Sequence, residues 1–204
     1  NSGLRRYNIT QVEKTLRAEP GADSADAEWV LITASIGRNA QAFAALYDSY
    51  LDRVYNYVYY RVGNRPDAED LTQQVFLNAW HAISRYKNTG ATFIAWLLTI
   101  AHNLVVSFYR KSKETTYLEQ EPAAHQRWAD PEAEALARND RVTVRRAILR
   151  LKPEWQQVII MRFIENLEYS DIAAALGKTE GNVRVIQHRS LAELQRLLVR
   201  EVKP

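Results

Sequence analysis

Apolar residues recur along most of the chain at the three- and four-residue spacing of α-helices. The clearest case is the segment 40–62, whose apolar positions are Phe43, Leu46, Tyr47, Tyr50, Leu51, Val54 and Val58. Because an α-helix turns once every 3.6 residues, this spacing gathers the apolar side chains on one face. Similar stripes run through 65–85 and 92–113, and no stretch has a convincing strand alternation. The pattern therefore predicts an all-α fold.

Capping residues divide this pattern into separate helices. Asp26, Asn39 and Asp130 have side chains that accept hydrogen bonds from the free N–H groups of a first helical turn. Gly37 and Gly63 stand where two of the stripes stop, as is common at helix C-termini. The expected helices are 27–36, 40–62, 65–85, 92–113, 131–150, 153–165, 169–176 and 179–200.

Charge divides the chain more clearly than its near-neutral total suggests. The 204 residues include 27 Lys and Arg against 24 Asp and Glu, a net charge of +3. The net charge is +3 over 1–113, −5 over 114–140 and +5 over 141–204. The segment 114–130 has little apolar periodicity, so we expect a flexible acidic linker with a reach of at most about 55–60 Å. The predicted organisation is a flexible extension at 1–25, a helical domain at 26–113, the linker at 114–130 and a second helical domain at 131–204.

The composition argues against several classes of function. Without cysteine the chain forms no disulfide, zinc finger or thiolate metal site, which fits a reducing cytoplasm. The four histidines show neither i, i+4 pairing nor an HExxH motif, and no phosphate-binding loop is present. We therefore expect no catalytic residues, no metal and no cofactor. The longest unbroken apolar run, 93–98, falls short of the roughly 18 residues that a membrane helix needs, and we expect a cytoplasmic location.

The segment 169–200 has the pattern of a helix-turn-helix. A short helix, 169–176, is followed by the turn residues Gly177 and Lys178, and Thr179 can cap a second helix. At 100° per residue, the second helix has an inward face of Val183, Gln187, Ser190, Leu194 and Leu197. Its outward face holds Gly181, Arg184, Val185, His188, Arg189 and Ala192. Donors and small residues on an open face suit DNA recognition. The alternative is a surface helix with an ordinary solvated basic face.

Two segments of the first domain also join polar and apolar faces. In 67–80 one side of the helix carries Asp70, Gln73, Gln74 and Asn78, which suits a basic helical partner; the alternative is a solvated face. The segment 93–111 places an apolar stripe before Arg110 and Lys111. Aromatic residues beside basic side chains suit the binding of single-stranded nucleic acid. The spacing of its aromatic residues nevertheless favours core packing over stacking on bases.

These segments together resemble bacterial RNA polymerase sigma factors of the extracytoplasmic-function group. The string Asp67-Ala-Glu-Asp-Leu, continued by Gln73, Val75-Phe76-Leu77 and Ala79-Trp80, is similar to their polymerase-binding helix. The string Phe93…Trp96-Leu97…Ile100-Ala101…Asn103…Arg110-Lys111 resembles their minus-ten-reading helix. The string Tyr169…Ile172-Ala173…Leu176-Gly177…Thr179-Glu180-Gly181…Val183-Arg184…His188-Arg189 resembles their minus-thirty-five-reading helix-turn-helix. The resemblance covers about 27–113 and 131–198.

The resemblance implies a two-domain initiation factor that binds core RNA polymerase and promoter DNA and assists promoter opening. Polymerase binding would fall to Asp67, Asp70, Gln73, Gln74 and Asn78. Minus-ten DNA would contact Lys87, Asn88, Thr89, Gly90, Thr92, Asn103, Arg110 and Lys111. Minus-thirty-five DNA would contact Thr179, Glu180, Gly181, Arg184, Val185, His188 and Arg189. The resemblance also implies an anti-sigma protein as a partner.

One alternative function remains open from the residues alone. A free-standing transcription regulator would bind duplex DNA through 169–200 without polymerase, and it would not need the polar face of 67–80.

Overall fold

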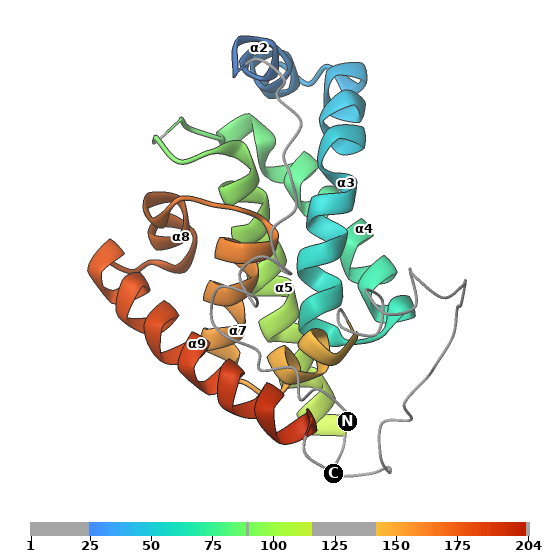
Figure 1. Cartoon of the computed structure of the whole chain (residues 1–204). Helices are drawn as coiled ribbons and strands as arrows, with labels where there is room; N and C mark the ends of the chain where they lie inside the picture. The colour runs from blue at the N-terminus through green and yellow to red at the C-terminus, as the bar shows by residue number, and fades with distance from the viewer. Residues whose placement is uncertain (1–24, 89, 116–141, 203–204) are drawn as a thin grey trace, which may run out of the picture.

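The computed structural model describes residues 25–88, 90–115 and 142–202, and these are helical almost throughout (Figure 1). The predicted extension at 1–25, except for Ala25, and most of the predicted linker lie outside the described residues, as does the predicted start of the helix at 131. No strand occurs among the described residues. The all-α prediction is confirmed.

The first group of helices forms what we call the N-terminal bundle. It consists of α2 (Ala25–Ile36), α3 (Ala40–Val62), α4 (Arg65–Ala82), the short 3-10 turn η1 (Ile83–Arg85) and α5 (Phe93–Thr115). The helices α3, α4 and α5 all pack against one another, and α2 lies across α3. Their facing sides are lined by the predicted stripes, for example Val54, Val75 and Leu97, which are fully buried.

The second group forms the C-terminal bundle. It contains a helix over 142–149, α7 (Pro153–Ile159), the π-helical turn η2 (Ile160–Ile164), α8 (Tyr169–Leu176) and α9 (Glu180–Val202). The helices α7 and α8 both pack on α9. The inward face predicted for α9 is confirmed, because Val183, Ser190 and Leu194 have no exposed surface.

Local capping signals set several helix ends as predicted. The Asn39 side chain accepts from the N–H groups of Gln41 and Ala42 at 3.0 and 3.1 Å, and Gly63 ends α3 in the left-handed conformation with φ of 82°. The Asn182 N–H donates to the Thr179 hydroxyl at 3.3 Å. These caps work because each uses atoms within a few residues of the helix end.

Four predicted boundaries were wrong. Helix α2 begins at Ala25, so Asp26 lies inside it and is not its cap. The helix predicted over 65–85 changes to a 3-10 turn at Ile83. The helix predicted over 153–165 changes to a π-helical turn at Ile160, where the N–H of Glu165 donates to the Ile160 carbonyl at 3.0 Å. The helix predicted over 92–113 continues to Thr115, two residues into the predicted linker.

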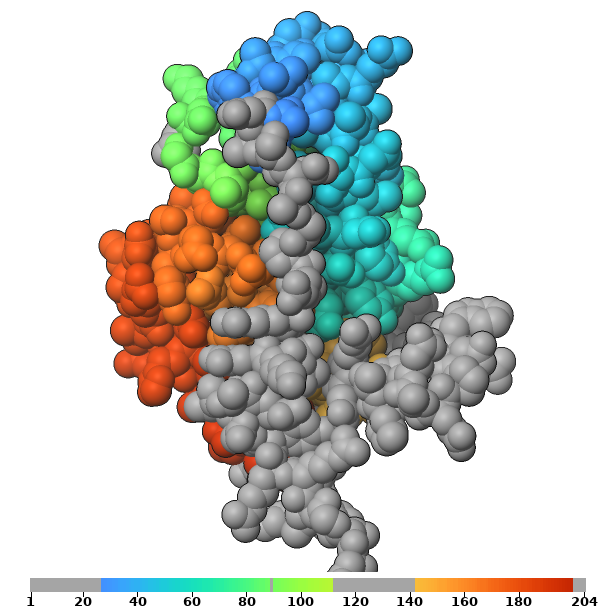
Figure 2. Space-filling model, turned by 45° about the horizontal axis from the view of Figure 1, so that its top comes forward, coloured from blue at the N-terminus to red at the C-terminus, as the bar shows by residue number. Residues whose placement is uncertain are grey.

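The two bundles share one hydrophobic core. Its buried residues run without interruption from α2 to α9, and α5 contacts α8 while α3 contacts η2. Figure 2 shows the orange segment of the C-terminal bundle lying directly against the green segment of the N-terminal bundle. Two domains were predicted, but no sequence pattern indicated that they would pack together.

Helix α5 is apolar enough, by length and composition alone, to cross a membrane. The stretch Phe93–Lys111 has a mean hydropathy of 1.3, although its longest unbroken apolar run, 93–98, is short. In the fold this helix contacts α3 and α4 on one side and α8 on the other. Its apolar residues are therefore those of a central core helix.

Candidate functional site

The outer side of α4 carries the residues predicted to bind polymerase. Asp70, Gln73, Gln74 and Asn78 are all exposed, because the opposite side of α4 holds the buried core stripe. The fifth, Asp67, is half-buried, and its N–H donates to the Asn64 side chain at 3.0 Å at the start of the helix. Asp67 therefore helps to begin α4.

A shallow hollow of about 400 Å³ lies on this side of α4. It is lined by Asp70, Gln73, Gln74 and Leu77. Leu77 is 57% exposed, so it presents an apolar side chain beside the polar ones. The motif contained Leu77, but the choice of polar candidates passed over it. We call this hollow and its lining the α4 face.

The loop between η1 and α5, together with α5, holds the residues predicted to contact minus-ten DNA. Lys87, Asn88, Gly90 and Thr92 are exposed in the loop, and Thr89 lies outside the described residues. The Asn88 side chain accepts from the Gly90 N–H at 3.1 Å, and Gly90 has φ of 87°, which favours glycine. The residues on α5, Asn103, Arg110 and Lys111, are also exposed.

The aromatic residues beside this loop are packed rather than free. The centre of the Tyr86 ring lies 5.5 Å from the centre of the Phe93 ring and 5.1 Å from that of the Trp96 ring, and both pairs pack edge to face. Phe93 is buried and also packs against Tyr50 of α3. The preference for core packing over base stacking is confirmed for Phe93. Together the rings pack the base of the loop against the bundle.

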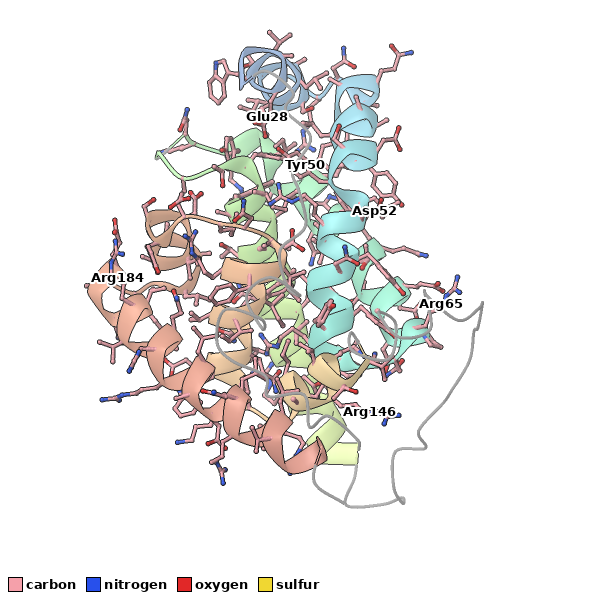
Figure 3. The ribbon with its side chains drawn as sticks, viewed as in Figure 1. Glu28, Tyr50, Asp52, Arg65, Arg146 and Arg184 are labelled. Carbon is pink, nitrogen blue, oxygen red and sulfur yellow. The ribbon has the colours of Figure 1, made fainter. Side chains whose placement is uncertain are left out.

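The start of α9 presents the residues predicted to contact minus-thirty-five DNA. All seven are exposed: Thr179, Glu180, Gly181, Arg184, Val185, His188 and Arg189. The view of the side chains shows Arg184 at the outer edge of the molecule, near the start of α9 (Figure 3). The turn before α9 is made by Gly177, whose φ of 61° ends α8 in the left-handed conformation. We call these seven residues the α9 face.

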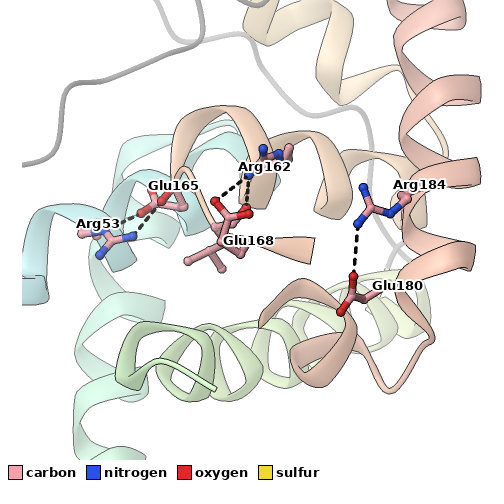
Figure 4. A network of polar contacts seen from close by, with 7 residues as sticks. Arg53, Arg162, Glu165, Glu168, Glu180 and Arg184 are labelled. Atoms are coloured by element: carbon pink, nitrogen blue, oxygen red, sulfur yellow. Dashed lines mark hydrogen bonds and ion pairs between the residues drawn. The ribbon is translucent and has the colours of Figure 1, made fainter. Parts of the chain in front are cut away.

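Two contacts hold the Arg184 side chain in position. Its guanidinium lies 3.9 Å from the centre of the Tyr169 ring, and its Nη2 pairs with Glu180 at 3.2 Å, as Figure 4 shows. The Arg162 guanidinium also lies against this ring, 4.8 Å from its centre. The motif included Tyr169 and Glu180, but the helical wheel of α9 alone gave no sign that Tyr169 supports Arg184.

Several polar contacts join the two bundles. The Arg53 side chain of α3 donates to the Glu165 carboxylate at 3.0 Å and to the Glu165 carbonyl at 2.8 Å (Figure 4). The Thr92 N–H donates to the Asp171 carboxylate of α8 at 2.9 Å. Arg145 donates to the Gly63 carbonyl at 2.9 Å. None of these pairs was predicted, because the partners lie about 80 to 110 residues apart in the sequence.

Burial at this junction changes the ionisation of Glu165. Its side chain is only 2% exposed, and loss of water contact raises its pKa from an ordinary value of 4.5 to about 7, although the Arg53 charge acts in the opposite direction. His102 of α5 is also partly buried, and desolvation, together with the charges of Arg61 and Lys178, lowers its pKa to about 4. The two groups therefore oppose each other in the pH dependence of stability.

We expect the variant Glu165→Gln to gain stability relative to the wild type as the pH rises. A carboxyl whose pKa is higher in the folded state stabilises the fold fully below pH 4.5, and this contribution is lost as the pH rises through 7. Glutamine does not titrate, so the difference in unfolding free energy should grow by up to about 3 kcal/mol between these limits. His102 is present in both proteins, and its contribution cancels.

Urea unfolding of both proteins at pH 5 and pH 7.5 measures this difference. Glu69→Gln, which alters an exposed glutamate paired with Arg65, is the matched control. A difference between Glu165→Gln and the wild type that stays constant across this range would contradict the prediction.

Comparisons with known proteins match both bundles. A family model described as sigma-70 region 2 matches residues 46–115, and one described as sigma-70 region 4 matches 147–196. The first therefore contains the α4 face and the loop, and the second contains the α9 face.

Two curated relatives are similar over most of the chain. The ECF RNA polymerase sigma factor BldN of Streptomyces coelicolor is 38% identical over 183 residues, which cover 88% of this chain and 69% of the relative. The ECF RNA polymerase sigma factor SigW of Bacillus subtilis is 30% identical, with coverage of 77% and 89% respectively.

Two solved structures share the fold. The structure of CnrH in complex with the cytosolic domain of CnrY has a TM-score of 0.64 at 22% identity and covers 84% of this chain and 97% of its own. The sigma factor RpoE in complex with the anti-sigma factor NepR, from Bartonella quintana, has a TM-score of 0.65 at 23% identity and covers 78% of this chain and 98% of its own.

Proposed function

The chain belongs to the ECF group of RNA polymerase sigma factors, and from this premise we propose which of its surfaces perform each step of promoter recognition. As a sigma factor it directs RNA polymerase to promoters, and by family it is a transcription initiation factor rather than an enzyme. The proposal assigns the α4 face to core polymerase, the loop before α5 to minus-ten DNA, and the α9 face to minus-thirty-five DNA.

The observation that carries this assignment is the one-sided arrangement of α9. Its inward residues are buried in the shared core, while all seven residues of the α9 face are exposed on the outer side. Arg184 can donate two hydrogen bonds to a guanine edge, and the basic side chains beside it can contact phosphates. Thr179 occupies the N-cap, where free N–H groups of the first turn favour a phosphate.

The loop and α5 supply a second surface of matching chemistry. Lys87 and Asn88 are exposed on a loop whose base packs against aromatic rings, and Arg110 and Lys111 are exposed towards the other end of α5. A single base that leaves the stack costs a few kcal/mol, which contacts with the loop can offset. We propose that this surface holds the opened minus-ten strand.

Regulation by a second protein is part of the proposal. The solved relatives that share the fold were determined with the cytosolic domain of CnrY and with the anti-sigma factor NepR. We propose that an anti-sigma protein likewise binds this chain in the cytoplasm. Because the chain has no cysteine, any redox or zinc sensing belongs to that partner.

Transcription of native genomic DNA by a purified bacterial core polymerase tests the function. Adding the chain should produce transcripts whose mapped 5′ ends share an upstream element at a fixed distance. The alternative, a free-standing regulator, predicts transcripts at the core-only level and tight binding of duplex DNA without polymerase. That result would contradict the proposal.

A further inference from the structure

We infer that Trp29 of α2 is a stacking platform for an unpaired base of single-stranded DNA, next to the loop before α5. This residue lies outside the α4 face, the loop and the α9 face. The contact rests on the proposed function, because it requires the loop to hold the opened minus-ten strand. Trp29 would touch that strand through the flat face of its ring, whereas the loop offers polar side chains.

Trp29 is a large aromatic side chain that the fold leaves open, at 43% exposed. Ile32 faces the core, and Glu28, one turn earlier, is half-buried on the same side of α2. Trp29 lies about 100° further round the helix than Glu28, at the margin of this inward side. Of the Phe, Tyr and Trp side chains in the described ranges, Tyr109 is the other exposed one, and its hydroxyl donates to the Arg61 carbonyl.

The start of α2 is joined to the base of the loop by a series of packed groups. The Tyr50 hydroxyl donates to the Glu28 carboxylate, and the centre of the Tyr50 ring lies 5.5 Å from that of Phe93 (Figure 3). Burial, and then the Glu28 hydrogen bond, raises the pKa of Tyr50, so the hydroxyl keeps the proton that it donates. Burial, and then the Glu28 charge, also raises the pKa of Tyr86 at the start of the loop. Trp29 directly follows Glu28 and therefore stands near this base.

The other end of α2 is fixed to the same region. Helix α2 packs on η1, the turn that immediately precedes the loop. Arg38, just after α2, donates to the Ser84 hydroxyl of η1 at 3.2 Å. Figures 1 and 2 both show α2, in blue, next to the green segment before α5. Helix α2 and the loop are therefore neighbours at one end of the molecule.

Basic side chains lie at this end of the molecule as well. Arg85 ends η1, Lys87 follows in the loop, and both are exposed. An aromatic ring beside positive charges suits a single strand, because the charges attract the phosphates while the ring stacks on a base. Helix α2 carries no basic residue of its own. Trp29 therefore supplies the stacking surface, and the neighbouring segment supplies the charge.

The rings at the two ends of the loop are already used in packing. Tyr86, Phe93 and Trp96 lie against one another with their ring centres 5.1 to 5.5 Å apart. A base that leaves the duplex loses its stacking, which costs a few kcal/mol. The exposed indole of Trp29 can restore that stacking for any of the four bases, because each has a flat π-face.

A promoter with one strand exposed provides the test. The probe is a promoter found by genomic transcription, with a duplex upstream part and an unpaired non-template strand across the minus-ten element. Core polymerase carrying the Trp29→Ala chain should bind it about 5- to 150-fold more weakly than with the wild type, which corresponds to the roughly 1–3 kcal/mol of one stacked base. Binding to a duplex fragment that ends before the minus-ten element should not change.

Further substitutions distinguish stacking from other contacts. Trp29→Phe keeps a flat ring and should bind close to the wild type. Trp29→Leu keeps an apolar side chain without a ring and should bind as weakly as Trp29→Ala. The matched control is Val30→Ala, at the next position of α2, which is 66% exposed and should bind like the wild type. Circular dichroism checks that each variant is folded.

Replacing the unpaired nucleotides one at a time by abasic ones identifies the stacked base. At that position the loss of the base should weaken binding by the wild type and have no further effect on Trp29→Ala, because both changes remove the same contact. At every other position the two losses should add.

The outcomes separate the Trp29 contact from the proposed function when Lys87→Ala and Asn88→Ala are measured on the same probe. Weakening by these two variants but not by Trp29→Ala would overturn the inference and leave the proposed function intact. Equal binding by Trp29→Leu and Trp29→Phe, or the absence of a coupled abasic position, would overturn it too. A coupled position at Trp29 without any effect of the loop variants would support the contact and contradict the loop assignment. A chain that directs polymerase to no promoter would contradict both, because no strand is opened for Trp29 to bind.

Discussion

The variant Leu77→Asp is expected to bind core polymerase about 100-fold or more weakly while its fold is unchanged. Leu77 is 57% exposed and lines the α4 face together with Asp70, Gln73 and Gln74. If a polymerase covers this hollow, Leu77 is its apolar anchor, and the loss of an interface hot spot costs roughly 2 kcal/mol or more. A carboxylate at this position adds the cost of losing water without a partner.

Fluorescence anisotropy of the labelled chain, titrated with core polymerase, measures the change in Kd. Val30→Asp on α2 is the matched control, because Val30 is an apolar side chain even more exposed, at 66%, and lies away from the α4 face. Thermal unfolding should be the same for both variants and the wild type. Equal weakening by the two variants would show that added negative charge, rather than the α4 face, is responsible.

The helices themselves were predictable because the signals that define them are local. Asn39 and Gly63 act on atoms within four residues, and the inward face of α9 follows from helical geometry alone. The π-helical turn at 160–164 was not predictable in this way. It is followed by Asn166 with φ of 53°, where glycine would be the usual signal, and no local pattern marks the change.

The positions of the candidate surfaces were predictable, but the contacts from other helices that hold their side chains in place were not. Apart from Asp67, which is half-buried, the residues predicted on α4 and all seven of the α9 face lie on exposed sides of their helices. The ring of Tyr169 beneath Arg184 belongs to a different helix, and Arg53 and Glu165 are separated by 112 positions. A periodic pattern reports on one helix at a time, so contacts between helices require the fold.

The same distinction applies to charge. The net charges of the segments indicated two basic domains. The contacts that join these domains nevertheless use two acidic residues of the second domain, Glu165 and Asp171. Net charge describes long-range attraction to nucleic acid. It does not describe a buried pair, whose energy depends on distance and lost water.

Arg184→Ala is expected to reduce discrimination at the upstream promoter element by about 1–3 kcal/mol, or roughly 5- to 150-fold. The size follows from the geometry: the Tyr169 ring and Glu180 hold the guanidinium in place before DNA arrives, so little side-chain freedom is lost on binding. Tyr169→Phe keeps the ring and should remain close to the wild type. Tyr169→Ala should lose part of the discrimination although the arginine is present.

The assay compares binding of polymerase with each variant to a promoter found by genomic transcription and to the same promoter with its upstream element altered. Arg196→Ala is the matched control, since Arg196 lies later on α9 and is paired with Glu193 on an exposed surface. A phosphate contact alone would weaken binding to both promoters equally and reduce its salt dependence. A base contact weakens only the intact element. Unchanged discrimination in Arg184→Ala would therefore show that Arg184 does not read a base. If only Tyr169→Ala kept its discrimination, Glu180 alone would suffice to position the Arg184 side chain.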